Sequence, residues 1–346
     1  MNKRKDKFKQ YLIDNGMDSA VITNSPDIFY LTGFTGEGYV VISPEGDTLV
    51  TDFRYVNQAG VQTKNLVICD VALSDTNELF AKFENTGFED MSVDYKRFCE
   101  LEKKFKKLTP IGSVLNDFRA VKEQSEINSI KKAQEITDKA FAHILDYIRP
   151  GVAEKDIALE LEYFMRSNGA QKASFDVIAA TGAHGAMPHA EPDERIIGMN
   201  EFVVLDFGCV VDGYCSDMTR TVCVGKATDE MKKVYNTVLN AQLRALEMIK
   251  AGVVACDVHN KAAEIINEFF PGRFGHGLGH GVGLEIHESP NLSPRNSNPL
   301  KSGNVVTVEP GIYIDGFCGV RIEDLVVVED GKCQNLTNSS KNLIEI

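Results

Sequence analysis

Apolar residues at helical spacing alternate with short apolar runs along the first third of the chain. The helical spacing predicts helices over 3–15, 76–84 and 98–108, and the runs predict strands over 18–23, 38–43, 47–52, 65–70 and 91–95. Strands and helices that take turns are typical of a layered α/β domain. We therefore expect a smaller N-terminal α/β domain over residues 1–118.

Longer helical segments dominate the rest of the chain. They are predicted over 125–148, 154–168, 228–250 and 256–270, and each ends near a glycine or a Pro-Gly pair. Ser125 suits the N-cap of the first of them. Strand pairs joined by Asp-Gly turns lie between and after these helices. We expect this second domain to cover residues 119–346.

The composition narrows the possible partners. The 346 residues carry a net charge of -13, which disfavours nucleic acid and anionic membrane surfaces. No apolar run reaches the length of a membrane span, and the basic N-terminus lacks the apolar region of a signal peptide. The eight cysteines form no CxxC pair, so they indicate neither a zinc knuckle nor a disulfide framework. The cytoplasm is the expected compartment.

An internal repeat organises the second domain. The stretch VVLDFGCVVDGYC, which begins at residue 203, matches VTVEPGIYIDGFC at a constant offset of 103. Asp206 then matches Glu309, and both stretches reach an Asp-Gly pair, which is the strongest short-range signal of a β-hairpin. Each returning strand carries a further acid, Asp217 or Glu323. The spacing predicts that Asp206 lies roughly opposite Asp217, and Glu309 opposite Glu323.

Two cross-strand acid pairs within apolar strands require an explanation. Opposite side chains in antiparallel strands have Cβ atoms about 4.5–5.5 Å apart, so like charges there repel each other. Solvent-facing acids on edge hairpins would escape this repulsion, and a shared proton could relieve one pair. Bound cations explain both pairs, because four carboxylates balance two divalent ions. Oxygen-rich ligation with one imidazole and no thiolate favours Mn²⁺, with Fe²⁺, Co²⁺ or Zn²⁺ feasible.

Three of the seven histidines lie in the glycine-rich stretch GHGLGHGVGLEIHE, residues 275–288. Its five glycines make a helix costly, at about 1 kcal/mol each relative to alanine. We expect an extended segment that can approach a ligand or another strand closely, with His276 and His280 on one face.

A second cluster, TGAHGAMPHAEP, contains His184 and His189 just ahead of the first hairpin. Its glycine and proline content predicts a loop, where reactive groups are often found. His189 is a candidate catalytic residue, whereas the role of His184 stays open. His143 and His259 fall inside predicted helices, so we expect them to be structural or on the surface.

These motifs together resemble the prolidase and aminopeptidase P branch of the pita-bread dinuclear metallopeptidases. The strings PHA, LDFG, SDMTRT, GHGLGHGVGLEIHE, VEPGIY and RIED carry the resemblance over roughly 125–346. The 1–115 region, with SPDIFYLTGFTG and DFRY, is similar to the smaller N-terminal domain of that branch. The resemblance implies an α+β protein with a pseudo-twofold pita-bread fold, an antiparallel sheet flanked by helices, preceded by the α/β domain. It also suggests a homodimer.

The resemblance implies a set of five metal ligands. Asp206 and Asp217 would bind one metal, and His280 and Glu309 would bind the other. Asp217 and Glu323 would each bridge the two metals.

Further roles follow from the same resemblance. Glu309 would also act as the acid/base near the attacking hydroxide. His189 and His287 would hold the substrate carbonyl, or its developing oxyanion, and the proline-side groups. His276 would line the proline-side pocket, and Arg321 would orient the carboxylates and the bound peptide.

The expected enzyme is a dinuclear metallo-exopeptidase that acts on proline-containing peptides. It would hydrolyse the bond between an N-terminal residue and a following proline, with a hydroxide shared by two metals as the nucleophile. The alternative is an Xaa-Pro dipeptidase restricted to dipeptides, and the sequence does not decide between them. A non-catalytic pita-bread binding module usually loses ligand acids, whereas here the whole ligand set is present. A metal-storage protein would not need the loop histidines.

Overall fold

The computed structural model describes residues 3–346, and the chain forms two compact units, Met1–Phe118 and Arg119–Ile346. Each unit has its own sheets and its own hydrophobic core. Among the described residues, none of the helices combines the length and the apolar character needed to cross a membrane.

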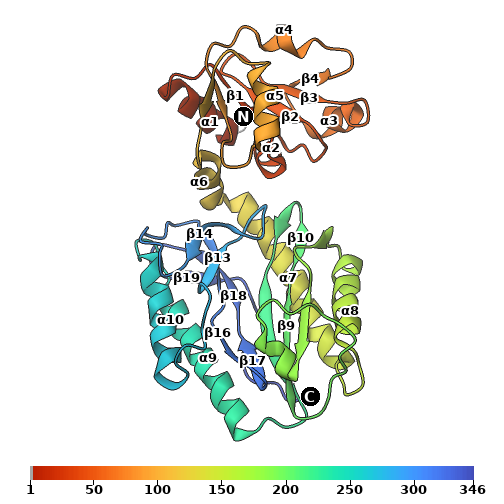
Figure 1. Ribbon diagram of the computed structural model, residues 1–346, viewed down its shortest axis with the longest axis vertical. Coiled ribbons are helices and arrows are strands. Elements are labelled where there is room, and N and C mark those ends of the chain that lie inside the picture. Colours follow the sequence, from red (N-terminus) through yellow and green to blue (C-terminus); the bar gives the residue numbers. More distant parts are fainter. Residues whose placement is uncertain (1–2) are drawn as a thin grey trace. The chain divides into compact units, whose positions relative to one another are not determined.

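The N-terminal unit is built around a mixed six-stranded sheet with the strand order β4-β3-β2-β1-β5-β6. The strands are β1 (Ser19–Ile22), β2 (Tyr39–Ile42), β3 (Thr48–Thr51), β4 (Val67–Asp70), β5 (Thr86–Phe88) and β6 (Leu108–Pro110). The helices are α1 (Lys3–Asp14), α2 (Ser25–Thr32), α3 (Val56–Gln62), α4 (Thr76–Phe80), α5 (Tyr95–Glu102) and α6 (Val114–Ala120), the last ending beyond Phe118. The layered α/β arrangement expected from the alternating pattern is confirmed (Figure 1).

Two predictions for this unit are wrong in detail. Residues 91–95 are not a strand: Asp94 caps α5 by accepting a hydrogen bond from the Arg97 backbone N–H, and Met91 is exposed. The strand of this region is β5, which pairs in parallel with β1. The helix predicted over 98–108 accordingly begins earlier, at Tyr95, and ends at Glu102.

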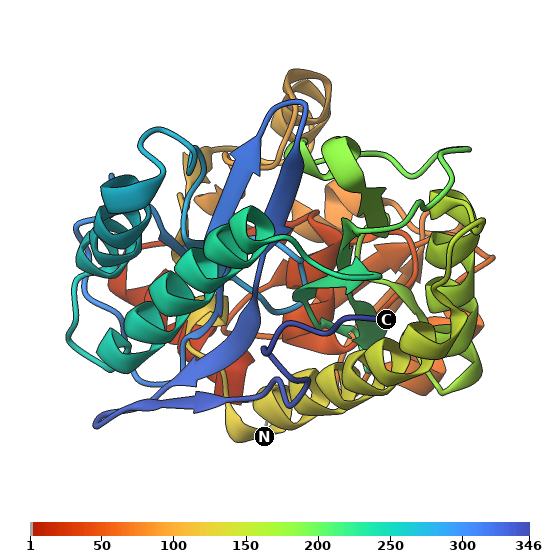
Figure 2. The ribbon, with the colours of Figure 1, turned by 90° about the horizontal axis from the view of Figure 1, so that it is seen from below.

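Four long helices frame the second unit. They are α7 (Gln124–Tyr147), α8 (Glu154–Ser167), α9 (Asp229–Met248) and α10 (Ala255–Phe269). Helix α7 packs against α8 and α9 packs against α10, and in Figure 2 helix α9 lies across the second hairpin, drawn in blue. The N-cap of α7 is Glu123 rather than Ser125, because Glu123 and Glu126 form a reciprocal capping box.

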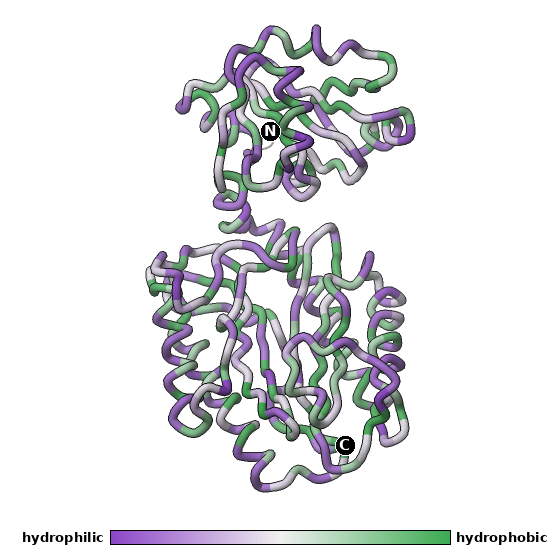
Figure 3. The backbone as a smooth tube through the Cα atoms, in the orientation of Figure 1, coloured by the Kyte–Doolittle hydropathy of each residue, from purple (hydrophilic) through white to green (hydrophobic). Residues whose placement is uncertain are grey.

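The strands of the second unit are antiparallel wherever they pair. They form sheets with the orders β11-β10-β7, β12-β9-β8, β14-β13-β15-β18-β19 and β16-β17. The strands are β7 (Lys172–Ala173), β8 (Ile178–Thr181), β9 (Glu201–Phe207), β10 (Cys209–Val211), β11 (Tyr214–Cys215), β12 (Met218–Val224), β13 (Gly279–Gly281), β14 (Glu288–Leu292), β15 (Val305–Val308), β16 (Gly311–Ile314), β17 (Cys318–Arg321), β18 (Asp324–Val328) and β19 (Cys333–Asn335). Figure 3 shows the mostly apolar strands inside this unit and the mixed character of its helices.

Both repeated stretches fold as hairpins that are interrupted once on each strand. In the second hairpin, β15 pairs with β18 and β16 pairs with β17 in one continuous register. Glu309 and Glu323 lie at the interruption, where that register places them opposite each other, as predicted.

The first hairpin corrects the predicted pairing. The residue opposite Asp206 is Thr219, two positions beyond Asp217. Asp217 lies just outside β12, at the interruption, where the register sets it opposite Gly208. The acids of the first hairpin are therefore diagonal neighbours, because an Asp-Gly turn at 212 and 213 fixes the register.

Candidate metal centre and active site

One cavity of the second unit, with a volume of about 500 Å³, gathers all of the predicted site residues. They reach it from the loop after β8, from both hairpins and from the glycine-rich stretch. The predicted residues in its lining are His189, Asp206, Asp217, His276, His280, His287, Glu309, Arg321 and Glu323. The fold therefore assembles one site from segments that are far apart in the sequence.

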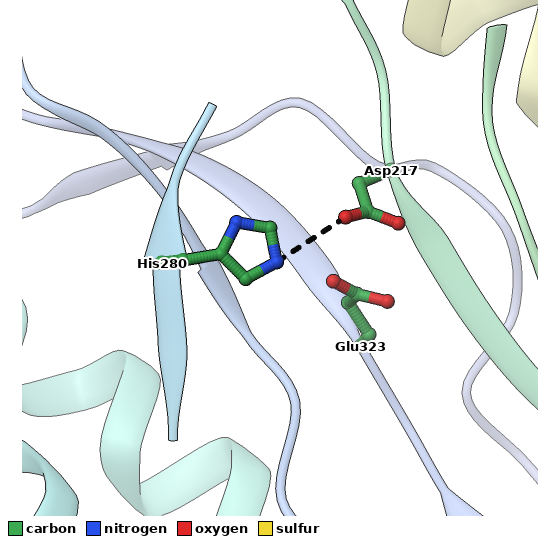
Figure 4. A group of neighbouring side chains, drawn as sticks. All are labelled: Asp217, His280 and Glu323. Atoms are coloured by element: carbon green, nitrogen blue, oxygen red, sulfur yellow. Dashed lines mark ion pairs between the residues drawn. The ribbon is translucent and has the colours of Figure 1, made fainter. Parts of the chain in front are cut away.

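Asp217, His280 and Glu323 form a compact group of potential ligands, whose donor atoms lie within 4.8 Å of one another (Figure 4). His280 Nε2 is 3.5 Å from Asp217 Oδ2 and 3.4 Å from Glu309 Oε1. Ligands that each lie ~2.0–2.2 Å from one ion are separated from each other by roughly this distance. The spacing of these atoms therefore suits a shared cation.

His280 presents Nε2 to the carboxylates in a fixed orientation. Its Nδ1 donates to the Gly281 carbonyl at 3.1 Å, which leaves the Nε2 lone pair free for a metal. Burial, together with the nearby His287, lowers the pKa of His280 to about 4, so the ring is neutral, as a ligand must be. A Cβ atom on Gly279 would lie 2.0 Å from the Thr307 carbonyl oxygen, so the predicted close approach of this strand is confirmed.

Buried carboxylates gather around this histidine with too little positive charge to balance them. Burial raises the pKa of Asp217 and of Glu323 well above their usual range, and the neighbouring acids raise them further. Burial also raises the pKa of Glu309 to about 8.

Three buried carboxylate oxygens, from Asp206, Asp217 and Glu323, have no hydrogen-bond partner among the described residues. Unpaired buried acids are costly, and divalent cations would satisfy both the charge and the open lone pairs. The residues present therefore fit a divalent metal site.

Arg321 is the one lysine or arginine among the described residues that line the cavity. It is buried, and its Nη2 donates to Asp206 Oδ2 at 2.5 Å. Its Nε donates to Thr219 Oγ1 at 3.0 Å, and its Nη1 donates to the Pro188 carbonyl at 3.2 Å. One guanidinium thus joins a carboxylate of the first hairpin to the loop that carries His189.

His276 lines the cavity, but both of its ring nitrogens have partners. Nδ1 donates to the Gly277 carbonyl, and Nε2 lies 2.9 Å from the Tyr313 hydroxyl. Arg321 donates to the same hydroxyl at 3.0 Å, so the hydroxyl hydrogen is directed at His276. Burial lowers the pKa of His276 to about 4. The neutral ring can therefore offer a substrate its face rather than a hydrogen bond.

His189 and His287 differ from the other two imidazoles in the cavity. Both side chains are exposed, and neither ring hydrogen-bonds to another described residue. The His287 ring makes an edge contact with His280, with centroids 4.4 Å apart. These are the two histidines whose nitrogens remain available to a substrate.

The remaining histidines lie outside this cavity. His143 pairs with Glu160 and stacks on Phe164 at the surface of α7 and α8. His259 is buried in α10 and stacks on Phe274. His184 lies in the same loop as His189, five residues earlier, and bonds to the buried Glu154.

Three residues of the site were not predicted. Thr219 donates to Glu323 Oε2 at 2.7 Å, Thr307 donates to Glu309 Oε1 at 3.2 Å, and Tyr313 links Arg321 to His276. Thr307 and Tyr313 could have been found from the two-residue period of a strand, since residues 307, 309, 311 and 313 share one face. Thr219 could have been found from its exact register opposite Asp206.

The chain belongs to metallopeptidase family M24. A sequence model of that family matches residues 128–330, and a model of the creatinase/prolidase N-terminal domain matches residues 4–121. Within this family the chain is a metallo-exopeptidase, and its fold is the α/β domain followed by the pita-bread domain that the sequence predicts.

Two solved structures and one related sequence align with essentially the whole chain. The Xaa-Pro dipeptidase from Bacillus anthracis is 39% identical, with a TM-score of 0.95 and 99% of both chains covered. The X-Pro aminopeptidase from Thermotoga maritima is 36% identical, with a TM-score of 0.92 and 99% of this chain and 100% of the other covered. The Xaa-Pro dipeptidase from Pyrococcus furiosus is 36% identical over 99% of this chain and 100% of its own length.

Proposed function

We propose that this protein is an Xaa-Pro aminopeptidase, which hydrolyses the bond between an N-terminal residue and a following proline. One observation carries the proposal: the four acids of the two hairpins, one oriented neutral imidazole and two unbonded histidines line the same cavity. The relatives named above act on Xaa-Pro substrates, which supports the same substrate class for this chain.

We assign five metal ligands to two divalent ions, for which Mn²⁺ is the first choice. Asp206 and Asp217 would hold one ion, His280 and Glu309 would hold the other, and Asp217 and Glu323 would contribute to both. Bound divalent cations would supply a water acidic enough to attack near neutral pH and would polarise the substrate carbonyl. The carboxylate oxygens that lack partners support this assignment.

The protein's own residues handle the protons and the developing charge. Glu309 receives a proton from the attacking water and passes it toward the proline nitrogen, which cannot leave as an amide anion. His189 and His287 donate to the carbonyl oxygen as negative charge develops on it. Arg321 holds Asp206 in place, and the His276 ring forms part of the pocket for the proline.

The proposal of an aminopeptidase rather than a dipeptidase rests on the surroundings of the cavity. Within the second unit, Phe175, Asp176, Val177 and Pro192 line both this cavity and an adjoining hollow of about 480 Å³. We infer that a peptide continuing beyond the proline extends toward this hollow. The named relatives include both kinds of enzyme, so the dipeptidase is the second candidate. A homodimer in the cytoplasm completes the proposal.

Turnover of matched peptides tests this function. Mn²⁺-loaded protein is assayed on an Xaa-Pro dipeptide, on an Xaa-Pro-Yaa tripeptide and on an Xaa-Ala-Yaa control. The proposal expects cleavage of both proline peptides and not of the control. Cleavage of the dipeptide alone would make the protein a dipeptidase, and no cleavage of either proline peptide would reject the peptidase assignment.

A further inference from the structure

The loop between β8 and the segment before β9 carries His189 into the cavity. It begins with the short helix η1 (Gly182–Ala186), and backbone hydrogen bonds from Met187 to His184 and from Ala190 to Met187 continue the turn. The His189 side chain is exposed and forms no hydrogen bond with the described residues. Its direction is therefore set by what holds the loop.

A single buried carboxylate ties this loop together at three points. Glu154, in the first turn of α8, has an exposed fraction of 0%. Its Oε1 accepts from the Thr181 backbone N–H at 2.7 Å, and its Oε2 accepts from the Asp193 backbone N–H at 3.4 Å. Between these two contacts, His184 Nδ1 lies 3.0 and 2.9 Å from the two oxygens. The beginning, the middle and the end of the loop thus converge on one residue of α8.

The partners of His184 also fix its ring. Nδ1 faces a carboxylate, so it carries a hydrogen and donates. Nε2 then presents its lone pair to Arg195 Nη1, which lies 3.4 Å away. Arg195 is itself paired with Asp193. The imidazole side chain, only 7% exposed, is held at both nitrogens and cannot rotate without breaking a contact.

The opposite side of the loop rests on the second hairpin. A Cβ atom on Gly319 of β17 would lie 1.7 Å from the Gly185 carbonyl oxygen, so η1 and β17 approach as closely as two backbones can. Arg321 donates to the carbonyl of Pro188, the residue directly before His189. The loop is therefore clamped between α8 and the hairpin that carries Glu309 and Glu323.

We propose that His184 and Glu154 are positioning residues for His189, and this inference rests on the function proposed above. They do not line the cavity and contact no proposed metal ligand. Their contribution is to fix the loop so that His189 meets the substrate oxygen. A misplacement of about 1 Å at a reacting group can lower a rate on the order of 100-fold, so such a clamp has a large kinetic effect.

Two variants of His184 and one matched control test the inference. His184→Leu removes the donor to Glu154. His184→Asn keeps a donor, because its amide nitrogen can occupy the place of Nδ1. The control is His143→Leu, which removes another histidine–glutamate pair with the same helix, at Glu160. Steady-state kinetics on the tripeptide, Mn²⁺ affinity by calorimetry and hydrogen exchange of the 181–193 peptide are measured for each.

We expect His184→Leu to lower kcat/KM on the order of 10- to 100-fold, mainly through kcat. Exchange of the 181–193 peptide should become faster, while Mn²⁺ affinity stays unchanged. His184→Asn should recover most of the activity, and His143→Leu should resemble the wild type throughout.

Other outcomes overturn the inference. Wild-type kinetics and exchange in His184→Leu would show that the pair does not hold the loop, and a parallel loss of Mn²⁺ affinity would show a general collapse of the site. Equal losses in the Leu and Asn variants would mean that the hydrogen bond is not what matters. A wild-type protein that cleaves no Xaa-Pro peptide would instead reject the proposed function, and loop exchange would still decide whether His184 fixes the loop.

Discussion

The two repeated hairpins of the second unit share a backbone but place their charges differently. At the offset of 103, Asp206 and Glu309 correspond, each on the outgoing strand. The acids of the returning strands do not correspond at this offset: Asp217 matches Val320, and Glu323 matches Arg220. The duplication therefore repeats the fold, while the chemistry depends on where the copies differ.

Because the charged residues of the two copies differ in position, the two hairpins bond to each other in two places, one inside the cavity and one outside it. Arg321 of the second hairpin bonds to Asp206 of the first, inside the cavity. Arg220 of the first hairpin bonds in return to Asp324 and to the Glu323 carbonyl of the second. Each hairpin thus contributes one arginine that bonds to an acid of the other hairpin.

Two adjacent residues on the returning side of the second hairpin, Glu323 and Asp324, show the consequence. The pKa of Glu323 is raised by burial and by the neighbouring acids. Burial would also raise the pKa of Asp324, but Arg220 and Lys341 lower it overall. The side that faces the cavity keeps acids whose charge is not balanced, whereas Asp324 on the other side is neutralised by Arg220 and Lys341.

The largest expected effect comes from replacing Asp217, the acid of the first hairpin that has no counterpart in the second. We expect Asp217→Asn to abolish both metal binding and peptide hydrolysis, because Asp217 is buried and belongs to the compact group of potential ligands with His280 and Glu323. Calorimetric titration with Mn²⁺ and tripeptide turnover measure the two losses. Asp315→Asn, in the exposed turn of the other hairpin, is the control and should behave as the wild type. Full activity in Asp217→Asn would show that the ligand assignment is wrong.

The candidate site residues were easier to detect in the sequence than the residues that hold them, for a physical reason. Asp206, Asp217, Glu309 and Glu323 were detectable because charged residues inside apolar strands conflict with their surroundings. Thr219 and Tyr313 cause no such conflict, since both are ordinary strand residues whose roles appear only when the register is known. Glu154 was equally hidden, because an acid in the first turn of a helix is expected without any other function.

The long helices of the second unit were also predictable, whereas parts of the N-terminal unit were not. Helix α7 repeats its apolar spacing over many turns, but α3 contains only 7 residues, which is too short for a clear period. Strand β5 is only Thr86–Phe88, with a glycine at its centre, and gives almost no apolar signal. Tertiary packing decides such short elements, so local sequence does not.

A second effect, on stability, tests the side of the hairpins that faces away from the cavity. Arg220→Met should lower the free energy of unfolding by about 3 kcal/mol, because it breaks a buried ion pair with Asp324, which is 0% exposed. Urea unfolding of the metal-free protein measures the change. Arg244→Met removes an exposed pair with Glu247 and should cost less than about 0.5 kcal/mol. Equal costs for the two variants would show that the buried arginine is not a structural ion pair.

The side of the hairpins that faces the cavity predicts an unusual dependence of stability on pH. The pKa of Glu309 in the folded protein is about 8, above its usual value, and the pKa values of Asp217 and Glu323 are raised as well. Below about pH 6.5 the lowered pKa values of His276 and His280 act in the opposite direction, but above it the folded state binds more protons than the unfolded state. We expect the stability of the metal-free protein to fall as pH rises from about 6.5 to about 8.

Urea unfolding in the presence of a chelator measures this slope. Glu309→Gln should make it shallower, because the side chain no longer ionises. Added Mn²⁺ should stabilise the protein more at the higher pH, since the ligands must lose their protons to bind. A metal-free protein that gains stability over this range would contradict the charge imbalance assigned to the cavity.

The smallest expected effect is a difference in stability between variants of the two turns. Both turns contain an Asp-Gly pair, but its backbone conformation differs. Asp212 has a φ of 52° and Gly213 a φ of 84°, whereas in the second turn only Gly316, with a φ of 69°, has a positive value. Asp212→Ala should therefore cost about 1 kcal/mol, because alanine has no local hydrogen bond to offset a left-handed backbone. Asp315→Ala should stay within about 0.5 kcal/mol. Asp212→Gly distinguishes the effect of the backbone from that of the charge. Like the alanine variant it loses the exposed contact with Lys132, yet it should be at least as stable as the wild type, because glycine adopts a positive φ without strain. If the Ala and Gly variants at 212 lose stability equally, the charge of Asp212 rather than its backbone distinguishes the first turn.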